Sequence, residues 1–252
     1  MSQLQLIHPN WPAPAKVKAL QTTRLGGVSQ TPYVSLNLGA HVGDDALAVR
    51  DNRQLLRTYL PSEPVWLNQV HGIEVIDAAK NTGLQNADAS FTTQANVVCV
   101  TMTADCLPVL LCDRAGTVVS AVHAGWRGLC DGVIEAAIRK MAVPPDDILA
   151  WLGPAIGPNA FEVGDDVRQQ FIAQNPQAEQ AFKPHPKQSP NDKWLCDMYL
   201  IAKQRLVKLG ITQIYGGDIN EDYCTYTDDM RFFSFRRDNV TGRMASMIWL
   251  ID

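Results

Sequence analysis

Three residues of types that bind metal ions occupy unusual places in the sequence. His71 and His123 each end a strand-like apolar run, and Cys106 lies in a polar break between the apolar runs at 97–103 and 108–113. Zinc takes thiolate and imidazole ligands readily, and a three-ligand set leaves a fourth position for water or substrate. These residues therefore indicate a catalytic metal site. On spacing alone, two hydrogen-bonded histidines and a core cysteine explain the pattern equally well.

Two arginines are candidates for binding a phosphate group. Arg127 stands at the expected start of a helix over residues 128–142, where free backbone N–H groups and the helix dipole attract anions. Arg24 lies beside the glycine pair at 26–27 and has the same potential. For both residues the alternative is a solvated arginine on the surface.

The remaining candidates lie in loops. Asp105 directly precedes Cys106 and either orients a metal ligand or forms a turn. His41 is flanked by glycines and is expected to line the pocket, whereas His8 and His185 stand in polar, proline-containing stretches and are expected to be solvated.

Strands and helices in a mixed order must position these side chains. The runs at 97–103, 108–113 and 117–123 are apolar without alternation, which is typical of strands buried on both faces. Turn residues at 113–116 join the last two into a hairpin. Other strands are expected at 17–22, 64–70, 72–77, 148–152 and 211–215. Helices are expected at 45–60, 128–142, 165–174 and 197–209. Polar loops are expected at 80–90 and 183–193, and a terminal hairpin at 231–250. With no repeat and no linker, we expect one α+β domain with mixed sheets over residues 1–252.

Composition narrows the class of protein. With 46% hydrophobic and 19% charged residues, the chain has enough apolar side chains for a substantial core. The net charge of −4 argues against nucleic-acid binding, and no apolar run is long enough to span a membrane. The first residues lack a basic region followed by an apolar one, so we expect no secretory signal and a cytoplasmic location. Of the six cysteines, Cys99 and Cys112 lie inside apolar runs, and we expect no structural disulfide.

Several segments together carry a resemblance to a known family. They are residues 23–29 (TRLGGVS), 35–39 (SLNLG) with 41–44 (HVGD), 68–72 (NQVHG), 103–109 (TADCLPV), 121–128 (AVHAGWRG), and 233–237 (FSFRR) with 241–243 (TGR). In this order, from about residue 20 to the C-terminus, the chain resembles the YfiH-like laccase-domain family. The resemblance implies the family's α+β cysteine-hydrolase fold. It also implies that His71, Cys106 and His123 bind the metal.

The resemblance implies an enzyme and leaves several activities open. Family members are described as purine nucleoside phosphorylases with adenosine deaminase side activity, as polyphenol oxidases and as peptidoglycan editing factors. The first hypothesis is a zinc enzyme that acts on adenosine, inosine or methylthioadenosine with phosphate. The second is copper at the same site, with Met102 as a weak axial ligand. The third is a hydrolase in which Cys106 is the nucleophile and His71 or His123 the base.

Overall fold

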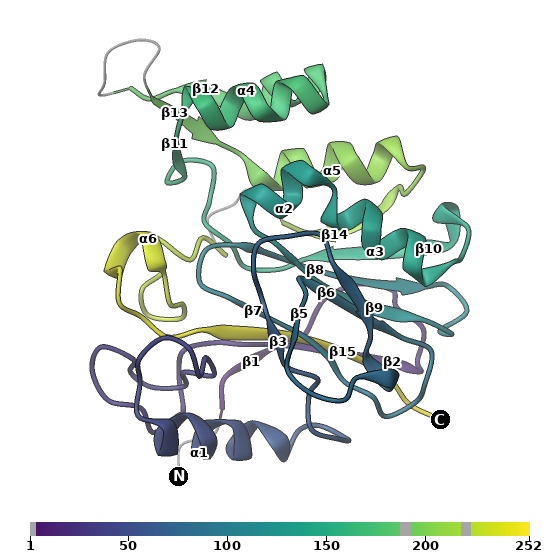
Figure 1. The fold of residues 1–252 in the computed structure, drawn as a ribbon, viewed down its shortest axis with the longest axis vertical. Coiled ribbons are helices and arrows are strands. Elements are labelled where there is room, and N and C mark those ends of the chain that lie inside the picture. Colours follow the sequence, from purple (N-terminus) through teal and green to yellow (C-terminus); the bar gives the residue numbers. More distant parts are fainter. Residues whose placement is uncertain (1–3, 187–192, 218–222) are drawn as a thin grey trace.

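Two β-sheets lie face to face at the centre of the computed structural model, which describes residues 4–186, 193–217 and 223–252 (Figure 1). The smaller sheet has the strand order β1 (Leu6–Ile7), β2 (Val17–Thr22), β15 (Met244–Leu250) and β7 (Cys99–Thr103). The larger sheet has the order β14 (Gln213–Gly216), β10 (Ile148–Leu152), β8 (Leu107–Asp113), β9 (Val119–Ala124), β6 (Ala89–Thr92) and β4 (Val75–Asp77).

Helices cover the outer faces of both sheets (Figure 1). The smaller sheet packs against α1 (Ala46–Arg57), and the larger one packs against α3 (Val133–Met141) and α5 (Met198–Lys208). Three further helices are α2 (Trp126–Asp131), α4 (Asp165–Gln174) and α6 (Phe235–Asp238). A third, small sheet has the order β11 (Glu162–Gly164), β13 (Lys193–Cys196) and β12 (Phe182–Pro184), and β3 (Leu67–Asn68) pairs with β5 (Gln85–Asn86). The result is an α+β architecture in which helix, sheet, sheet and helix layers follow one another.

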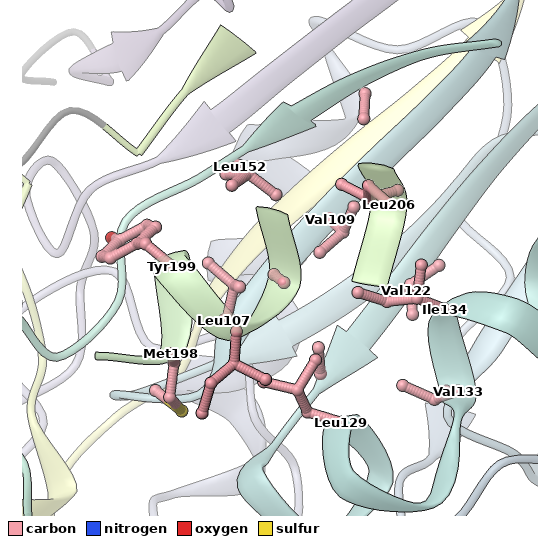
Figure 2. Packing of buried hydrophobic residues seen from close by; sticks show 14 of the residues in the cluster. Leu107, Val109, Val122, Leu129, Val133, Ile134, Leu152, Met198, Tyr199 and Leu206 are labelled. Carbon is pink, nitrogen blue, oxygen red and sulfur yellow. The ribbon is translucent and has the colours of Figure 1, made fainter. Parts of the chain in front are cut away.

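Strand β8 shows why the central strands are apolar throughout. Leu107 and Val109 face the helices, where they join one apolar cluster with Ile134 of α3 and Leu206 of α5 (Figure 2). Leu110, on the opposite face, packs between the two sheets. Because both faces are covered, all seven residues of β8 are buried. Each large side chain buried in this way contributes about 1.5–3 kcal/mol of hydrophobic stabilisation.

Several predicted elements are confirmed. Strands β2 and β10 and helix α4 have the predicted bounds, 17–22, 148–152 and 165–174. The predicted hairpin is also present, because β8 and β9 pair in an antiparallel arrangement across a turn.

Three predictions about elements were wrong. The helix expected over 128–142 is two helices, α2 and α3, because Gly132 has a φ of 102° and breaks the backbone between them. The terminal hairpin over 231–250 is instead the short helix α6 and one strand, β15, which pairs with β2 and β7. The loop expected at 80–90 contains β5 and the first residues of β6. Of the loop expected at 183–193, residues 187–192 lie outside the described residues, while Lys183 and Pro184 belong to β12 and Lys193 to β13.

Two further observations concern the cysteines and the helices. All six cysteines are free thiols. Within the described ranges, no helix is both long and apolar enough to cross a membrane. The extent of the domain, 1–252, stays a prediction.

Candidate metal centre and active site

The side chains of His71, Cys106 and His123 converge at one point. Their ligand atoms all lie within 4.8 Å of one another, and Cys106 Sγ is 3.8 Å from His71 Nε2. Tetrahedral zinc needs sulfur and nitrogen ligands about 3.5 Å apart, so only a small adjustment would bring them to a shared ion. His71 is exposed, Cys106 is half-buried and His123 is only 3% exposed. The group is therefore open to solvent on one side.

The two stacked sheets explain how Cys106 and His123 meet. Cys106 lies in the connection between β7 of the smaller sheet and β8 of the larger one. His123 lies in β9, opposite Pro108 of β8 in the antiparallel register. The chain thus passes from one sheet to the other next to the second histidine.

A buried carboxylate, Asp88, holds both histidines in place. Its side chain accepts hydrogen bonds from the backbone N–H groups of Val70, His71 and Gly72 at 3.2, 2.9 and 2.7 Å. It also lies 2.7 Å from Nδ1 of His123. Because Asp88 precedes β6, which pairs with β9, its carbonyl accepts the backbone N–H of His123 as well. One residue therefore fixes the His71 loop and the His123 ring together.

The contact with Asp88 determines which nitrogen of His123 is available. Burial raises the pKa of Asp88. The hydrogen bond and charge of His123, together with hydrogen bonds from backbone N–H groups, lower it by more, so the net shift of the pKa is downward. An ionised carboxylate on Nδ1 keeps a proton there, so Nε2 is the nitrogen that would bind a metal after releasing its own proton. Such a carboxylate partner commonly orients metal-bound histidines.

A second clamp holds the His71 loop against the smaller sheet. The Gln69 amide donates to the carbonyl of Met102 at 2.8 Å and accepts from the N–H of Met102 at 2.7 Å. This reciprocal pair ties the loop to β7. His71 itself has a φ of 60°, a left-handed conformation that is uncommon for a residue other than glycine.

The backbone at Gly125 leaves room for the side chains of His71, Cys106 and His123. A Cβ atom added there would lie 2.7 Å from Cδ2 of His71 and 3.2 Å from Sγ of Cys106. Its φ of −61° is open to any residue, so space alone favours glycine here. The close approach of this backbone helps to define the pocket in which a metal would sit.

Cys106 and His123 shift each other's protonation. Burial raises the pKa of Cys106, but the charge of His123 and hydrogen bonds from both histidines bring it down to about 6. Burial lowers the pKa of His123, but the Cys106 thiolate and Asp88 raise it to about 9. The site thus favours a thiolate at neutral pH, the form of cysteine that binds metals and attacks electrophiles.

Two cavities meet at Cys106. One, of about 130 Å³, is mainly apolar and is lined by Ala104, Asp105, Cys106, Trp126, Ile156, Phe161, Met198, Phe235 and Arg236. The other, of about 220 Å³, is more polar and is lined by His41, Gln69, His71, Met102, Thr103, Ala104, Cys106, His123, Phe235 and Arg243. A substrate with one apolar and one polar end could therefore reach across the Cys106 thiol.

Neither arginine singled out in the sequence lines these cavities. Arg127 is exposed and lies over the ring of Trp126, 4.6 Å from its centroid. Since α2 has only six residues, the long helix whose N-terminus was expected to attract an anion is absent. Arg24 donates to the carbonyls of Val34 and Asp229, so its guanidinium holds loops together.

The other two candidates have different outcomes. His41 does line the polar cavity, as expected. The carboxylate of Asp105 accepts hydrogen bonds from the Thr225 hydroxyl at 2.7 Å and from the backbone N–H of Arg236 at 2.6 Å. Asp105 therefore links the segments around Thr225 and Arg236 to the site. Neither of these contacts is with His71, Cys106 or His123, so they do not support the expectation that Asp105 orients a metal ligand.

Sequence reasoning missed the roles of Asp88 and Arg243. Asp88 directly precedes β6, and a carboxylate at the start of a strand was the available signal. Arg243 belongs to the TGR segment that supports the family resemblance, but nothing in its spacing indicates that it faces Cys106.

Comparisons with known proteins agree with the resemblance. Residues 18–251 match the sequence model of a family described as multi-copper polyphenol oxidoreductase laccase. The purine nucleoside phosphorylase YfiH of Shigella flexneri is 55% identical over 253 residues, covering 98% of this chain and 99% of the relative. A purine nucleoside phosphorylase of Pseudomonas aeruginosa is 52% identical over 244 residues, covering 97% and 98%. The crystal structure of a Neisseria meningitidis protein of family DUF152 has a TM-score of 0.92 at 48% identity, with 100% of both chains covered. These likenesses confirm the predicted α+β fold.

Proposed function

The chain belongs to the family described as multi-copper polyphenol oxidoreductase laccase, and within it we propose a zinc-dependent purine nucleoside phosphorylase. The observation that carries this proposal is the group of His71, Cys106 and His123, which lines the polar cavity and borders the apolar one at Cys106. Full-length relatives named purine nucleoside phosphorylase support it. The proposed substrates are adenosine, inosine and methylthioadenosine, with deamination of adenosine as a side activity.

The donor set fits a catalytic zinc ion. His71, Cys106 and His123 would hold it, and Asp88 would orient His123 through Nδ1. When bound, zinc supplies a Lewis acid that polarises a substrate oxygen or lowers the pKa of a water molecule. Gly125 keeps the space beside these three side chains open.

Phosphorolysis exchanges one bond at the ribose. An oxygen of phosphate bonds to C1′ while the bond from C1′ to the purine nitrogen breaks, and the electron pair leaves with the base. The proton that phosphate loses is the one that the base gains, so the products are a ribose phosphate and free purine. The residues need to hold phosphate and base on opposite sides of the ribose, because the incoming and leaving groups occupy opposite faces of C1′.

The apolar cavity suits the purine base. Trp126, Phe161 and Phe235 offer aromatic surfaces, and Ile156 and Met198 complete the apolar lining. Aromatic faces stack on purines with little dependence on the base's substituents. This agrees with a substrate range of several purine nucleosides.

Products identify the reaction directly. With adenosine and phosphate, we expect the protein to release adenine and a ribose phosphate. Without phosphate it should at most convert adenosine to inosine. Chromatography of the reaction mixture distinguishes these products. If no purine nucleoside is consumed while a muropeptide precursor is turned over, the phosphorylase proposal is wrong.

A metal-free cysteine hydrolase is the second candidate, favoured by the 3.8 Å distance between Cys106 Sγ and His71 Nε2. In that reaction Cys106 is the nucleophile and a histidine the base, and the substrate could be a cell-wall precursor that carries a wrong amino acid. Cys106→Ala separates the two candidates when metal content is measured with activity. Loss of activity from a protein that never held metal supports the hydrolase.

A copper site is the remaining possibility for the metal. Met102 lines the same cavity as the three ligands and could act as a weak axial ligand. A multi-copper oxidase, however, needs imidazoles for several copper ions, and the whole chain has five histidines. We therefore propose that phenol oxidation, where observed, comes from one copper ion at the zinc site.

A further inference from the structure

We infer that Arg243 and His41 form the subsite for inorganic phosphate, in the polar cavity beside Cys106. This inference rests on the proposed phosphorylase function and names the residues that would select its second substrate. It replaces the phosphate site expected at Arg127.

Arg243 presents one free edge of its guanidinium group. Its Nη1 donates to the carbonyls of Thr241 and Gly242 at 2.9 and 3.0 Å, which fixes the side chain. Its Nε and Nη2 donate to none of the residues that the structure describes. These two atoms form the edge that binds two oxygens of an oxyanion at once. An arginine whose side chain is fixed and whose Nε–Nη2 edge has no partner among the described residues can bind an anion without rearranging.

His41 and Thr103 add unused hydrogen-bonding groups to the same cavity. Among the described residues, the ring of His41 has no hydrogen-bond partner. The Thr103 hydroxyl is also unpartnered, although Thr103 is only 1% exposed. Buried polar groups without partners are rare in folded proteins, and a ligand can supply the missing partner.

The charge of the cavity favours an anion. No Asp or Glu is among the described residues that line it, whereas the cationic side chain of Arg243 does line it. Burial and the nearby charge of Arg243 lower the pKa of His41, so Arg243 supplies the positive charge and the neutral ring of His41 can donate one N–H. A phosphate dianion would pair with the guanidinium of Arg243 on this wall.

The position of the subsite also orients the nucleoside. The apolar and polar cavities share Ala104, Cys106 and Phe235. With the base in the apolar cavity and phosphate beside Arg243, the ribose lies between them, next to the thiol. Phosphate then faces C1′ from the side opposite the departing base, as phosphorolysis requires.

Kinetics with two arginine variants test this subsite in the purified, metal-loaded protein. Arg243→Met should raise the KM for inorganic phosphate by about 10-fold to 100-fold, the usual effect of losing a charged bidentate contact. The KM for adenosine and the metal content should change little. Arg127→Met, which removes a neighbouring cation outside both cavities, should change neither KM. A raised phosphate KM in Arg127→Met alone would overturn the assignment, as would equal rises in both KM values of Arg243→Met.

A second variant covers the case in which Arg243→Met does not fold. His41 is exposed and makes no hydrogen bond to the described residues, so His41→Ala should fold normally. We expect its phosphate KM to rise by about tenfold or more, roughly the effect of one hydrogen bond to a charged group. An unchanged phosphate KM in this variant would remove His41 from the subsite and contradict the inference.

Calorimetric titration with inorganic phosphate alone separates this inference from the proposed function. If the wild type releases no adenine, the phosphorylase proposal fails, but phosphate binding can still be measured. Binding that weakens by about tenfold or more in Arg243→Met supports the anion subsite. Absence of phosphate binding to the wild type, or equal binding to both proteins, overturns it.

Discussion

Replacing His71 by alanine is expected to remove the metal ion and reduce phosphorolysis about a thousandfold while the fold survives. A metal at a reacting centre supplies several kcal/mol, and each 1.36 kcal/mol corresponds to a tenfold change in rate. His71 is exposed and receives its support through its backbone N–H, which alanine keeps. Metal analysis, an adenosine phosphorolysis assay and thermal unfolding measure the three expected results.

His8→Ala is the matched control, because His8 is exposed and lies outside both cavities. It should retain metal, activity and stability. If His71→Ala keeps full metal content, the ligand assignment is wrong.

His123→Ala differs from His71→Ala in a way that the sequence did not indicate. On the sequence alone, both variants are expected to keep the fold largely intact. In the structure, His123 is buried and is paired with Asp88, which is fully buried. Removing one member of such a pair leaves a charge without its partner and costs about 3–5 kcal/mol. His71→Ala is therefore the cleaner test of the metal site.

Asp88→Asn should weaken metal binding and stability together. The two carboxylate oxygens accept from the His71 loop and from His123, and an amide can offer only one oxygen. Its NH₂ group must then face N–H donors. We expect a loss of about 2–4 kcal/mol in the free energy of unfolding and a 10-fold to 100-fold lower metal affinity. Denaturant unfolding of the metal-stripped protein and competition with a chelator measure the two effects.

Asp113→Asn provides the matched control for Asp88→Asn. Asp113 is also buried, and its carboxylate accepts from the N–H groups of Thr117 and Val118 and from the Thr117 hydroxyl. It stabilises the turn between β8 and β9 and lines neither cavity. This variant should lose stability but keep its metal affinity. If Asp88→Asn also keeps its metal affinity, Asp88 is a purely structural residue.

The sequence predicted the central strands for physical reasons that act locally. Strands buried on both faces need apolar residues at every position, which makes β8 and β9 recognisable. Polar interruptions at their ends then identify Cys106 and His123 as exceptions. The family resemblance joined His71 to them, since no short spacing connects it to the others.

Long-range contacts explain what the sequence could not predict. The pairing of β15 with β2 and β7 joins segments from both ends of the chain, and turn residues at 238–242 suggested a local hairpin instead. Likewise, Arg127 is close to His123 in sequence but lines neither cavity, whereas Arg243 is far in sequence and lines one of them.

The central claim, phosphorolysis at a metal site held by His71, Cys106 and His123, is tested most directly by one paired measurement. Metal content and phosphate-dependent release of adenine are determined for the wild type and for Cys106→Ala. We predict about one zinc ion per wild-type chain, with adenine formed only when phosphate is present, and the loss of both in the variant. Adenine release by a metal-free wild type, or by a Cys106→Ala variant that has lost its zinc, would contradict the account.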